Sequence, residues 1–307
     1  MGKYDIFDAL IMATRIKTVN QLFFLQKFKF ATIAISLIFA AIGMTGCGQQ
    51  SGDTTAKGTL EKIKQRDKIV IGVKTDYTPF GFIDKNGKNA GLEVDIANYI
   101  AKELLGSESK VEFVSVVAAN RIEFLKQGKI DLVIATMTDT PERRKVIDFS
   151  ENYYSAGTGL LTRKDSGIKS WDNLKGKKVC GIQGSFYNKE LIERGIQMAN
   201  FPGTAEAYKA LQEGRCVGFA YDDSALIGKL LEPNWSKDWH QPLPPILPQG
   251  WGMGIRKGDT KFLESVNQTI LKMEAAGFIV AAEKKWKIPA TDYAKKRMAA
   301  AKQKSSK

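Results

Sequence analysis

An apolar run at 130–135 is followed by polar side chains suited to binding a small anion. The run has the pattern of a strand buried on both faces, and ligands of open α/β sheets usually bind where such strands end. The polar residues after it are Thr136, Thr138, Thr140 and Arg143. Thr140 can cap a helix that begins at Pro141, so free N–H groups, hydroxyls and a guanidinium converge there. We predict a carboxylate site; the alternative is a solvated helix start whose arginine pairs with Glu142 or Asp148.

Strands and helices alternate on both sides of this segment. Before it, the pattern predicts strands at 68–73 and 110–116 and helices at 94–105 and from Asn120. After it, a second set of elements begins with the segment 170–182. It continues with helices at 185–195 and 205–214, a strand at 216–221, and helices at 222–231, 260–276 and 279–286. This order favours βαβ units, mostly parallel sheets and two modest lobes. Glycine-rich segments at 157–159 and 250–254 bracket the second set.

The N-terminus has the pattern of an export signal. Lys27 and Lys29 precede an apolar run at 31–43, which is the length of a secretory core and short for a membrane span. Met44-Thr45-Gly46-Cys47 then resembles a lipobox, with Met44 where leucine is usual. We expect a signal peptide at 1–46, a lipid anchor on Cys47 and a polar tether at 47–58, giving an exported, periplasmic or cell-surface protein held at the membrane. The alternative is a signal-anchor helix.

Composition narrows the class of protein. The net charge is +13, and six basic residues lie in the acid-free segment 294–307. This segment lacks interleaved aromatics, so we expect a frayed, solvated basic tail at 293–307 and no nucleic-acid partner. His240 is the single histidine, which argues against a histidine-based triad and excludes a histidine-rich metal cluster. Cys180 and Cys216 lie in strand-like runs and form either a disulfide or two buried thiols.

Six segments together resemble one protein family. They are VKTDYTPFGF at 73–82, GLEVDIA at 91–97, NRIEFL at 120–125, DLVIATMTDTPERRKVIDFS at 131–150, LKGKKVCGIQGS at 174–185 and FAYDDSAL at 219–226. In this order they resemble the polar amino-acid branch of the bacterial extracellular solute-binding proteins of ABC transporters, over about residues 60–290. The resemblance implies a type II periplasmic-binding-protein fold, with two βα sheets joined by a two-strand hinge. Lobe 1 would comprise 59–156 and 254–292, and lobe 2 would comprise 157–253.

The same resemblance implies a ligand site in the cleft between the lobes. Arg143, with Thr138 and the backbone near Thr136, matches the group that binds the ligand's α-carboxylate. Asp222 matches the acid that receives the α-ammonium; its alternative is a helix cap, a role that Asp223 could fill. The remaining expected ligand contacts are the N–H groups of Gly184 and Ser185 from lobe 2, the aromatic wall of Tyr77 and Phe80, and Asp76. A plain Gly-Ser turn and core packing of Phe80 are the alternatives.

Lys74 and Arg121 match positions that are basic in aspartate- and glutamate-binding members of the family. Two cations beside Arg143 in a water-poor cleft are unfavourable unless the ligand supplies a second carboxylate. We therefore expect an acidic amino acid, glutamate or aspartate, as the ligand. The alternative is that Arg121 points to solvent beside Glu123.

The resemblance implies a substrate-binding component of an ABC importer that delivers its ligand to a membrane permease by hinge closure. It implies a monomer that needs no cofactor or metal and is not an enzyme. Two alternatives stay open on the same fold: a ligand-sensing surface module, and a dehydratase-type enzyme. For the enzyme, acid–base chemistry would fall to the carboxylate pairs Glu93–Asp95 or Asp222–Asp223.

Overall fold

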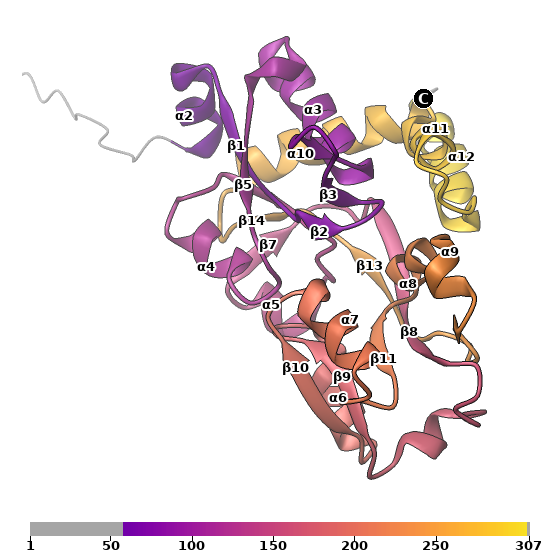
Figure 1. Ribbon diagram of the computed structural model, residues 1–307. Helices are drawn as coiled ribbons and strands as arrows, with labels where there is room; N and C mark the ends of the chain where they lie inside the picture. The colour runs from indigo at the N-terminus through magenta and orange to yellow at the C-terminus, as the bar shows by residue number, and fades with distance from the viewer. Residues whose placement is uncertain (1–57, 306–307) are drawn as a thin grey trace, which may run out of the picture. The chain divides into compact units, whose positions relative to one another are not determined.

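The computed structural model describes residues 58–305, so the expected signal peptide, the anchor Cys47 and nearly all of the tether lie outside the described residues. Two mixed sheets form the framework (Figure 1). The first has the order β5-β1-β6-β14-β7, with bounds Val111–Ser115, Ile69–Val73, Leu132–Ile134, Gly254–Arg256 and Ile147–Phe149. The second has the order β10-β9-β11-β8-β12, with bounds Gln197–Phe201, Lys178–Ile182, Phe219–Asp222, Tyr154–Arg163 and Trp239–His240. We call the parts built on these sheets lobe 1 and lobe 2. The predicted two-lobed α/β fold is confirmed.

Lobe 1 is assembled from two separate parts of the chain. β1 pairs in parallel with β5 and β6, and β14 joins from the C-terminal part, antiparallel to β6 and β7. Its other elements are α2 (Thr59–Arg66), α3 (Leu92–Leu105), α4 (Arg121–Lys126), α5 (Pro141–Arg144), α10 (Thr260–Ala275), α11 (Phe278–Lys285) and the small sheet of β2 (Asp76–Tyr77), β3 (Gly81–Ile83) and β4 (Asn89–Ala90). The central residues of β1 and β6 are buried, as expected of strands covered on both faces.

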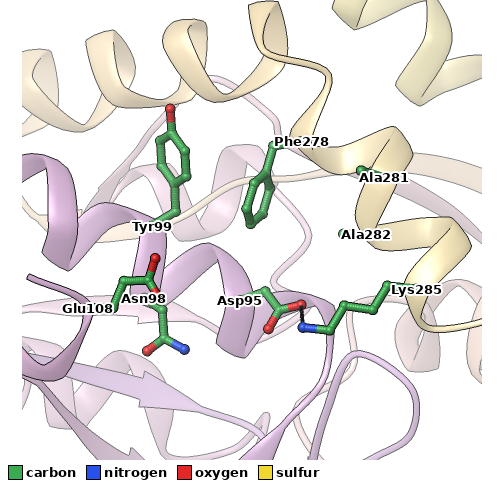
Figure 2. A pocket seen from close by; sticks show the side chains of 8 residues that line it. All are labelled: Asp95, Asn98, Tyr99, Glu108, Phe278, Ala281, Ala282 and Lys285. Atoms are coloured by element: carbon green, nitrogen blue, oxygen red, sulfur yellow. Dashed lines mark hydrogen bonds and ion pairs between the residues drawn. The ribbon is translucent and has the colours of Figure 1, made fainter.

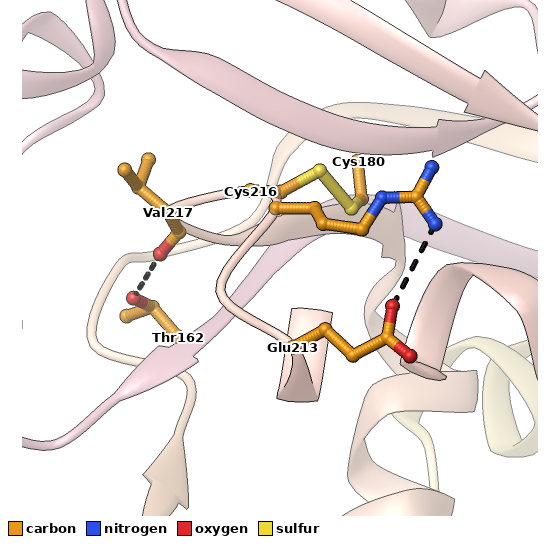
Figure 3. Close-up of a disulfide and its surroundings, with 6 residues drawn as sticks. Thr162, Cys180, Glu213, Cys216 and Val217 are labelled. Carbon is orange, nitrogen blue, oxygen red and sulfur yellow. Dashed lines mark hydrogen bonds and ion pairs between the residues drawn. A yellow bond between two sulfur atoms is a disulfide. The ribbon is translucent and has the colours of Figure 1, made fainter. Parts of the chain in front are cut away.

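Lobe 2 combines parallel and antiparallel pairing. β9 pairs in parallel with β10 and β11, whereas β8 runs antiparallel to β11 and β12. Its helices are α6 (Tyr187–Glu193), α7 (Thr204–Gln212), α8 (Asp223–Leu230) and α9 (Pro233–Ser236). Cys180 on β9 and Cys216 before β11 form a disulfide with their Cα atoms 5.5 Å apart (Figure 3). Of the two alternatives that the sequence left open, the structure contains the disulfide.

Two antiparallel strands connect the lobes. The chain leaves the lobe 1 sheet after β7 and enters β8, and it returns to β14 through β13 (Ile246–Trp251). β13 pairs with the first half of β8, from Trp251 opposite Tyr154 to Ile246 opposite Thr158. Tyr154 and Trp251 also contact Phe80, with ring centroids 5.2 Å from it in both cases. An aromatic cluster therefore stiffens the base of the connection.

The C-terminal segment differs from the predicted frayed tail. It forms a helix, α12 (Asp292–Ser305), that packs on α10 and α11. Ala294 and Ala301 are buried in that contact, and Arg297 Nε donates to Glu274 Oε1 over 2.7 Å. Small alanines let the helix approach closely, and the lysines lie on its exposed side. The sequence prediction weighed the charge of this segment and missed its buried alanine face.

Within residues 58–305, no helix combines the length and apolarity needed to cross a membrane. The same residues contain no group of three or more His, Cys, Asp or Glu side chains placed to hold a metal ion.

Candidate functional site

The turn after β6 positions the predicted carboxylate-binding residues. The strand ends at Ile134, and Thr136 adopts a left-handed backbone conformation with φ 45° that turns the chain. Thr140 then caps α5, because its side chain accepts a hydrogen bond from Arg143 N at 3.3 Å. Pro141 occupies the first turn of α5, where its missing N–H costs nothing. Local chemistry therefore fixes where Arg143 leaves the backbone.

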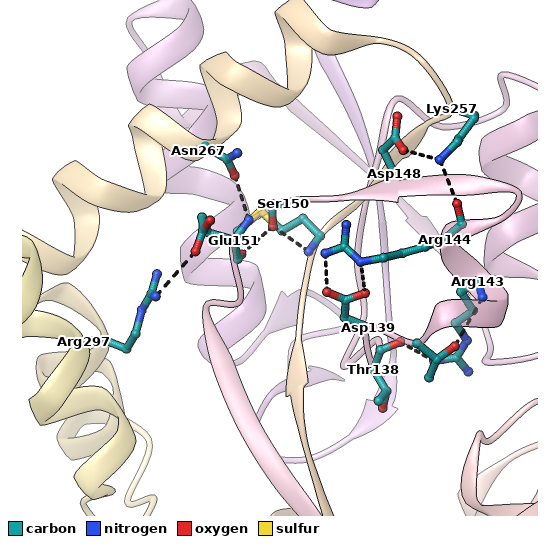
Figure 4. Close-up of polar contacts among 12 residues, drawn as sticks. Thr138, Asp139, Arg143, Arg144, Asp148, Ser150, Glu151, Lys257, Asn267 and Arg297 are labelled. Atoms are coloured by element: carbon teal, nitrogen blue, oxygen red, sulfur yellow. Dashed lines mark hydrogen bonds and ion pairs between the residues drawn. The ribbon is translucent and has the colours of Figure 1, made fainter.

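Arg143 and Arg144 point to different partners (Figure 4). Arg143 donates through Nη1 to Thr138 O at 2.7 Å and through Nη2 to Gly184 O at 2.9 Å, so it spans the two lobes. Burial, followed by repulsion from Arg121, lowers the pKa of Arg143 to about 9. Arg144 binds Asp139 instead, and Asp148 binds Lys257 at 2.8 Å. The alternative in which Asp148 pairs with Arg143 is wrong.

A small interlobe cavity of about 10 Å³ lies beside Arg143. Lobe 1 contributes Lys74, Ala118, Arg121, Thr136, Thr138 and Arg143, and lobe 2 contributes Ser185, Phe186, Tyr187, Tyr221 and Asp222. The cations come from one lobe and the carboxylate from the other. Seven of the predicted ligand-binding residues meet here, although they come from five separate segments of the sequence.

Lys74 and Arg121 are buried, with 4% and 3% of their surfaces exposed. Lys74 Nζ donates to Tyr221 OH at 2.6 Å across the lobes and lies 4.7 Å above the ring of Tyr77. Arg121 donates through Nη1 to Ala135 O, while its Nε has no partner among the described residues. Burial lowers the pKa of both side chains. Arg121 therefore faces the cleft, and the alternative that it points to solvent is wrong.

Asp222 and its neighbour Asp223 divide two roles. Asp223 Oδ1 accepts hydrogen bonds from Gly157 N at 3.0 Å and Ser224 N at 2.9 Å, which fixes the start of α8. Asp222 makes no side-chain cap and instead accepts a hydrogen bond from Tyr77 OH at 2.9 Å. Burial raises the pKa of Asp222 to about 6. The carboxylate in the cavity is thus free of the structural role that competed with ligand binding.

Three predicted residues serve other contacts. Asp76 does not line the cavity: its Oδ2 accepts hydrogen bonds from Thr204 N at 3.1 Å and Thr204 Oγ1 at 3.2 Å, at the start of α7 in lobe 2. Phe80 is also outside the cavity and packs in the aromatic core, as its alternative stated. Tyr77 does not line the cavity either, but its hydroxyl donates to Asp222 and its ring contacts Lys74 and Tyr221, which do line it. The expected roles of Asp76 and Phe80 as direct ligand contacts are therefore corrected.

The expected anion site at Gly184 and Ser185 is also corrected. Ser185 N donates to Ile182 O at 3.2 Å within the turn, and Gly184 presents its carbonyl to Arg143. Gly184 has φ +78°, and a Cβ there would lie 2.8 Å from the backbone of Ala118 in lobe 1. Glycine is required because the lobes approach so closely, and Ser185 is the residue of this pair that lines the cavity.

Sequence reasoning missed Tyr187, Tyr221 and the part played by Glu93. Glu93 is fully buried behind the cavity, and Tyr187 and Tyr221 line it. Tyr221 could have been found because it directly precedes Asp222 on β11. Glu93 lay within a quoted motif, but nothing local distinguishes it from a helix-start acid.

A larger pocket lies elsewhere on lobe 1 (Figure 2). It has a volume of about 420 Å³ between α3 and α11, and none of the predicted ligand-binding residues lines it. Its charged groups already pair: Lys285 Nζ and Trp286 Nε1 both donate to Asp95 Oδ2 at 2.7 Å. The interlobe cavity, by contrast, holds buried charges with incomplete partners, so it is the better candidate site.

Comparison with known proteins identifies the family. Residues 69–289 match the bacterial extracellular solute-binding proteins, family 3. The chain belongs to this family. The ABC transporter glutamine-binding protein GlnH of Bacillus subtilis is 36% identical over 84% of this chain and 97% of the relative. The L-glutamate/L-aspartate-binding protein of Pseudomonas aeruginosa is 30% identical over 75% of this chain and 80% of the relative.

Solved structures agree with this assignment. A crystal structure of the solute receptors for L-cysteine of Neisseria gonorrhoeae superposes with a TM-score of 0.72 at 32% identity, covering 76% of this chain and 95% of the other. This family 3 solute-binding protein thus shares the type II periplasmic-binding-protein fold, and membership places it among exported binding proteins. The names of these relatives differ in the amino acid bound, so the family alone does not define the ligand.

Proposed function

We propose that this protein is the extracytoplasmic substrate-binding component of an ABC amino-acid importer and that it binds an acidic amino acid, glutamate or aspartate. One observation carries the proposal. Two buried cations, Lys74 and Arg121, and the half-buried Arg143 line the interlobe cavity with a single carboxylate, Asp222. Buried charges need partners of opposite sign. A ligand with one ammonium and two carboxylates matches that arrangement.

The α-carboxylate and α-ammonium groups have separate partners in this proposal. Arg143 presents a planar fork whose geometry matches two carboxylate oxygens, and Thr138 lies beside it in the cavity. Asp222 reaches in from the opposite lobe, with its carboxylate oriented by Tyr77 OH. The ammonium would replace solvent at this buried acid.

The ligand's side-chain carboxylate would meet Lys74 and Arg121. Arg121 Nε has no partner among residues 58–305, although it is buried, and is therefore left as a donor for such a group. A glutamine amide would bring no negative charge to the two cations inside the cavity, at a cost of about 1–3 kcal/mol relative to glutamate. This corresponds to roughly tenfold to a hundredfold in affinity.

Hinge closure would couple binding to transport. Contacts that span the lobes converge on the cavity, through Arg143 with Gly184 and through Lys74 with Tyr221. A ligand held by both lobes favours the closed form only by its extra affinity for that form. We propose that a membrane permease recognises the closed form, that the protein works as a monomer, and that Cys47 holds it at the membrane.

The ligand preference is tested by calorimetric titration of refolded protein, freed of carried-over ligand, against glutamate, aspartate, glutamine, arginine, cysteine and cystine. Arg121→Met is expected to weaken glutamate binding by roughly tenfold to a hundredfold and to leave glutamine binding nearly unchanged. Lys126→Met on the same helix is the matched control, because Lys126 is exposed and, among the described residues, its ion pair is with the exposed Glu123. Unchanged glutamate affinity in Arg121→Met would remove this residue from the site.

A neutral amino acid is the second candidate, because relatives are named for glutamine and L-cysteine. Tighter binding of either than of glutamate would keep amino-acid binding and reject the acidic preference. Turnover of prephenate or arogenate would reject the binding-only role in favour of a dehydratase. A sensing module would be indicated if the protein bound a receptor only with its ligand present and if its loss left amino-acid uptake by the cell unchanged.

A further inference from the structure

Glu93 is a buried carboxyl group directly behind the ligand cavity. It is the second residue of α3 and is fully buried. Its Oε1 accepts hydrogen bonds from Thr136 N at 2.5 Å and from Tyr153 OH. Its Oε2 is buried and has no partner among the described residues. One oxygen is thus fixed in place, and the other is available to carry a proton.

The charged groups that face Glu93 are the two cations assigned to the ligand's side chain. Lys74 follows β1 and Arg121 begins α4, and both line the cavity. Each is attracted electrostatically to Glu93, while the one other titratable group in contact, Tyr153, donates its hydroxyl proton. Neither cation forms an ion pair with Glu93 in residues 58–305, so their charge is shared between Glu93 and the cavity.

Burial raises the pKa of Glu93 to about 7, although Tyr153, Thr136, Lys74 and Arg121 all oppose this shift. The carboxyl group can therefore gain or lose a proton near neutral pH. A negative charge placed against Lys74 and Arg121 would oppose the ionised form of Glu93 further. A neutral amide in the same place would leave it unaffected.

We propose that Glu93 is a specificity-determining residue that competes with the ligand's side-chain carboxylate for Lys74 and Arg121, so that binding an acidic amino acid draws one proton from solvent onto Glu93. The inference rests on the proposed acidic ligand. With Glu93 ionised, the two cations already have a counter-charge and accept a neutral side chain. With Glu93 protonated, Lys74 and Arg121 lack that counter-charge and are free to bind the ligand's side-chain carboxylate.

The direction of the pH dependence follows from proton linkage. If binding takes up protons, affinity falls as pH rises through the pKa of Glu93, by at most about tenfold per pH unit. Glutamate affinity is therefore expected to fall between pH 6.5 and pH 8.5, whereas glutamine affinity stays level. Loss of ionised Asp222, whose pKa is about 6, weakens both ligands equally on the acid side. The ratio of the two affinities isolates Glu93.

The experiment is calorimetric titration of the purified protein with glutamate and with glutamine at several pH values. Each titration is run in phosphate and in Tris, whose different ionisation heats reveal the number of protons taken up. Wild type should take up a fraction of a proton with glutamate at pH 7 and none with glutamine. Glu93→Gln keeps an acceptor for Thr136 and Tyr153 and should abolish the uptake. Glu123→Gln, at an exposed acid of α4, should behave as wild type.

Tyr153→Phe provides a second variant that keeps the carboxyl group. It removes a hydrogen bond that lowers the pKa of Glu93, so the fall in glutamate affinity should move to higher pH. Equal proton uptake with both ligands, or uptake that persists in Glu93→Gln because Lys74 titrates, would overturn the role of Glu93 alone. Absence of glutamate binding at every pH, with glutamine bound, would overturn the acidic ligand and this inference together.

Discussion

The two lobes meet the cleft with opposite charge. Lobe 1 presents Lys74, Arg121 and Arg143, and lobe 2 presents Asp222 among tyrosine hydroxyls. Among the described residues, neither set forms an ion pair within its own lobe, and the lobe 1 carboxylates that attract Lys74, Asp76 first and Glu93 more weakly, lie outside the cavity. An amino acid carries both signs on one small molecule and can complete both sets together. The difference between the lobes therefore favours a ligand whose charged groups all find partners only when the lobes close.

A second contact between the lobes has the reverse character. Asp76 of lobe 1 accepts two hydrogen bonds from Thr204 at the start of α7, and its carboxylate lies at the positive end of that helix. This contact is complete without any ligand. The lobes thus meet both at the cavity proposed for the ligand and at a contact outside it, which allows the closed form to be disturbed at either place separately.

Replacing the carboxylate of lobe 2 should have the largest effect. Asp222→Asn leaves the ligand's ammonium group without its buried partner, at a cost of about 2–5 kcal/mol, or roughly thirtyfold to several-thousandfold in affinity. The loss should be similar for every amino acid bound, in contrast to Arg121→Met. Calorimetry at pH 7.5 measures it, with Asp172→Asn at an exposed acid of lobe 2 as control. Unchanged affinity would place the ammonium elsewhere.

Removing the disulfide should destabilise lobe 2, which carries it, more than lobe 1. Cys180 and Cys216 close a loop with a sequence separation of 36, and lobe 1 has no such link within the described residues. Cys180→Ala with Cys216→Ala should lower the free energy of unfolding by about 2–4 kcal/mol. Urea denaturation measures it, and ligand affinity in the folded range should change little. A reductant that leaves the denaturation midpoint of wild type unchanged would contradict this expectation.

Breaking the ligand-independent contact should have the smallest effect. Thr204→Val removes the hydroxyl that donates to Asp76 but keeps the backbone N–H donor. The contact between the lobes should therefore lose about 0.5–1.5 kcal/mol of stabilising free energy. Affinity should fall by about tenfold at most, equally for all ligands, and the ligand-free protein should become more open. Small-angle scattering detects the opening, and added ligand should reverse it. A ligand-selective loss would mean that Thr204 belongs to the binding site.

Part of the site could be predicted because its causes are local. Thr140 caps α5, Pro141 starts it, and Arg143 follows within one turn, so the position of this arginine needs no distant residue. Buried strand patterns and helix periodicity likewise predicted the two α/β lobes. The errors have the opposite origin: Asp76 meets Thr204 and Gly184 meets Ala118 only after distant segments pack together. Direct contact of each remaining predicted residue with a ligand stays a prediction.

By itself, the sequence determined the fold class, the family and the arginine that leads the carboxylate site, because strand burial, helix capping and motif order are properties of neighbouring residues. Only the tertiary structure decided that Cys180 bonds to Cys216, that Arg121 is buried beside Lys74, and that Glu93 stands behind both. These facts depend on distances across separate strands and helices. Such distances are set by packing of the whole lobe, and burial there also changes the charge that a side chain carries near neutral pH.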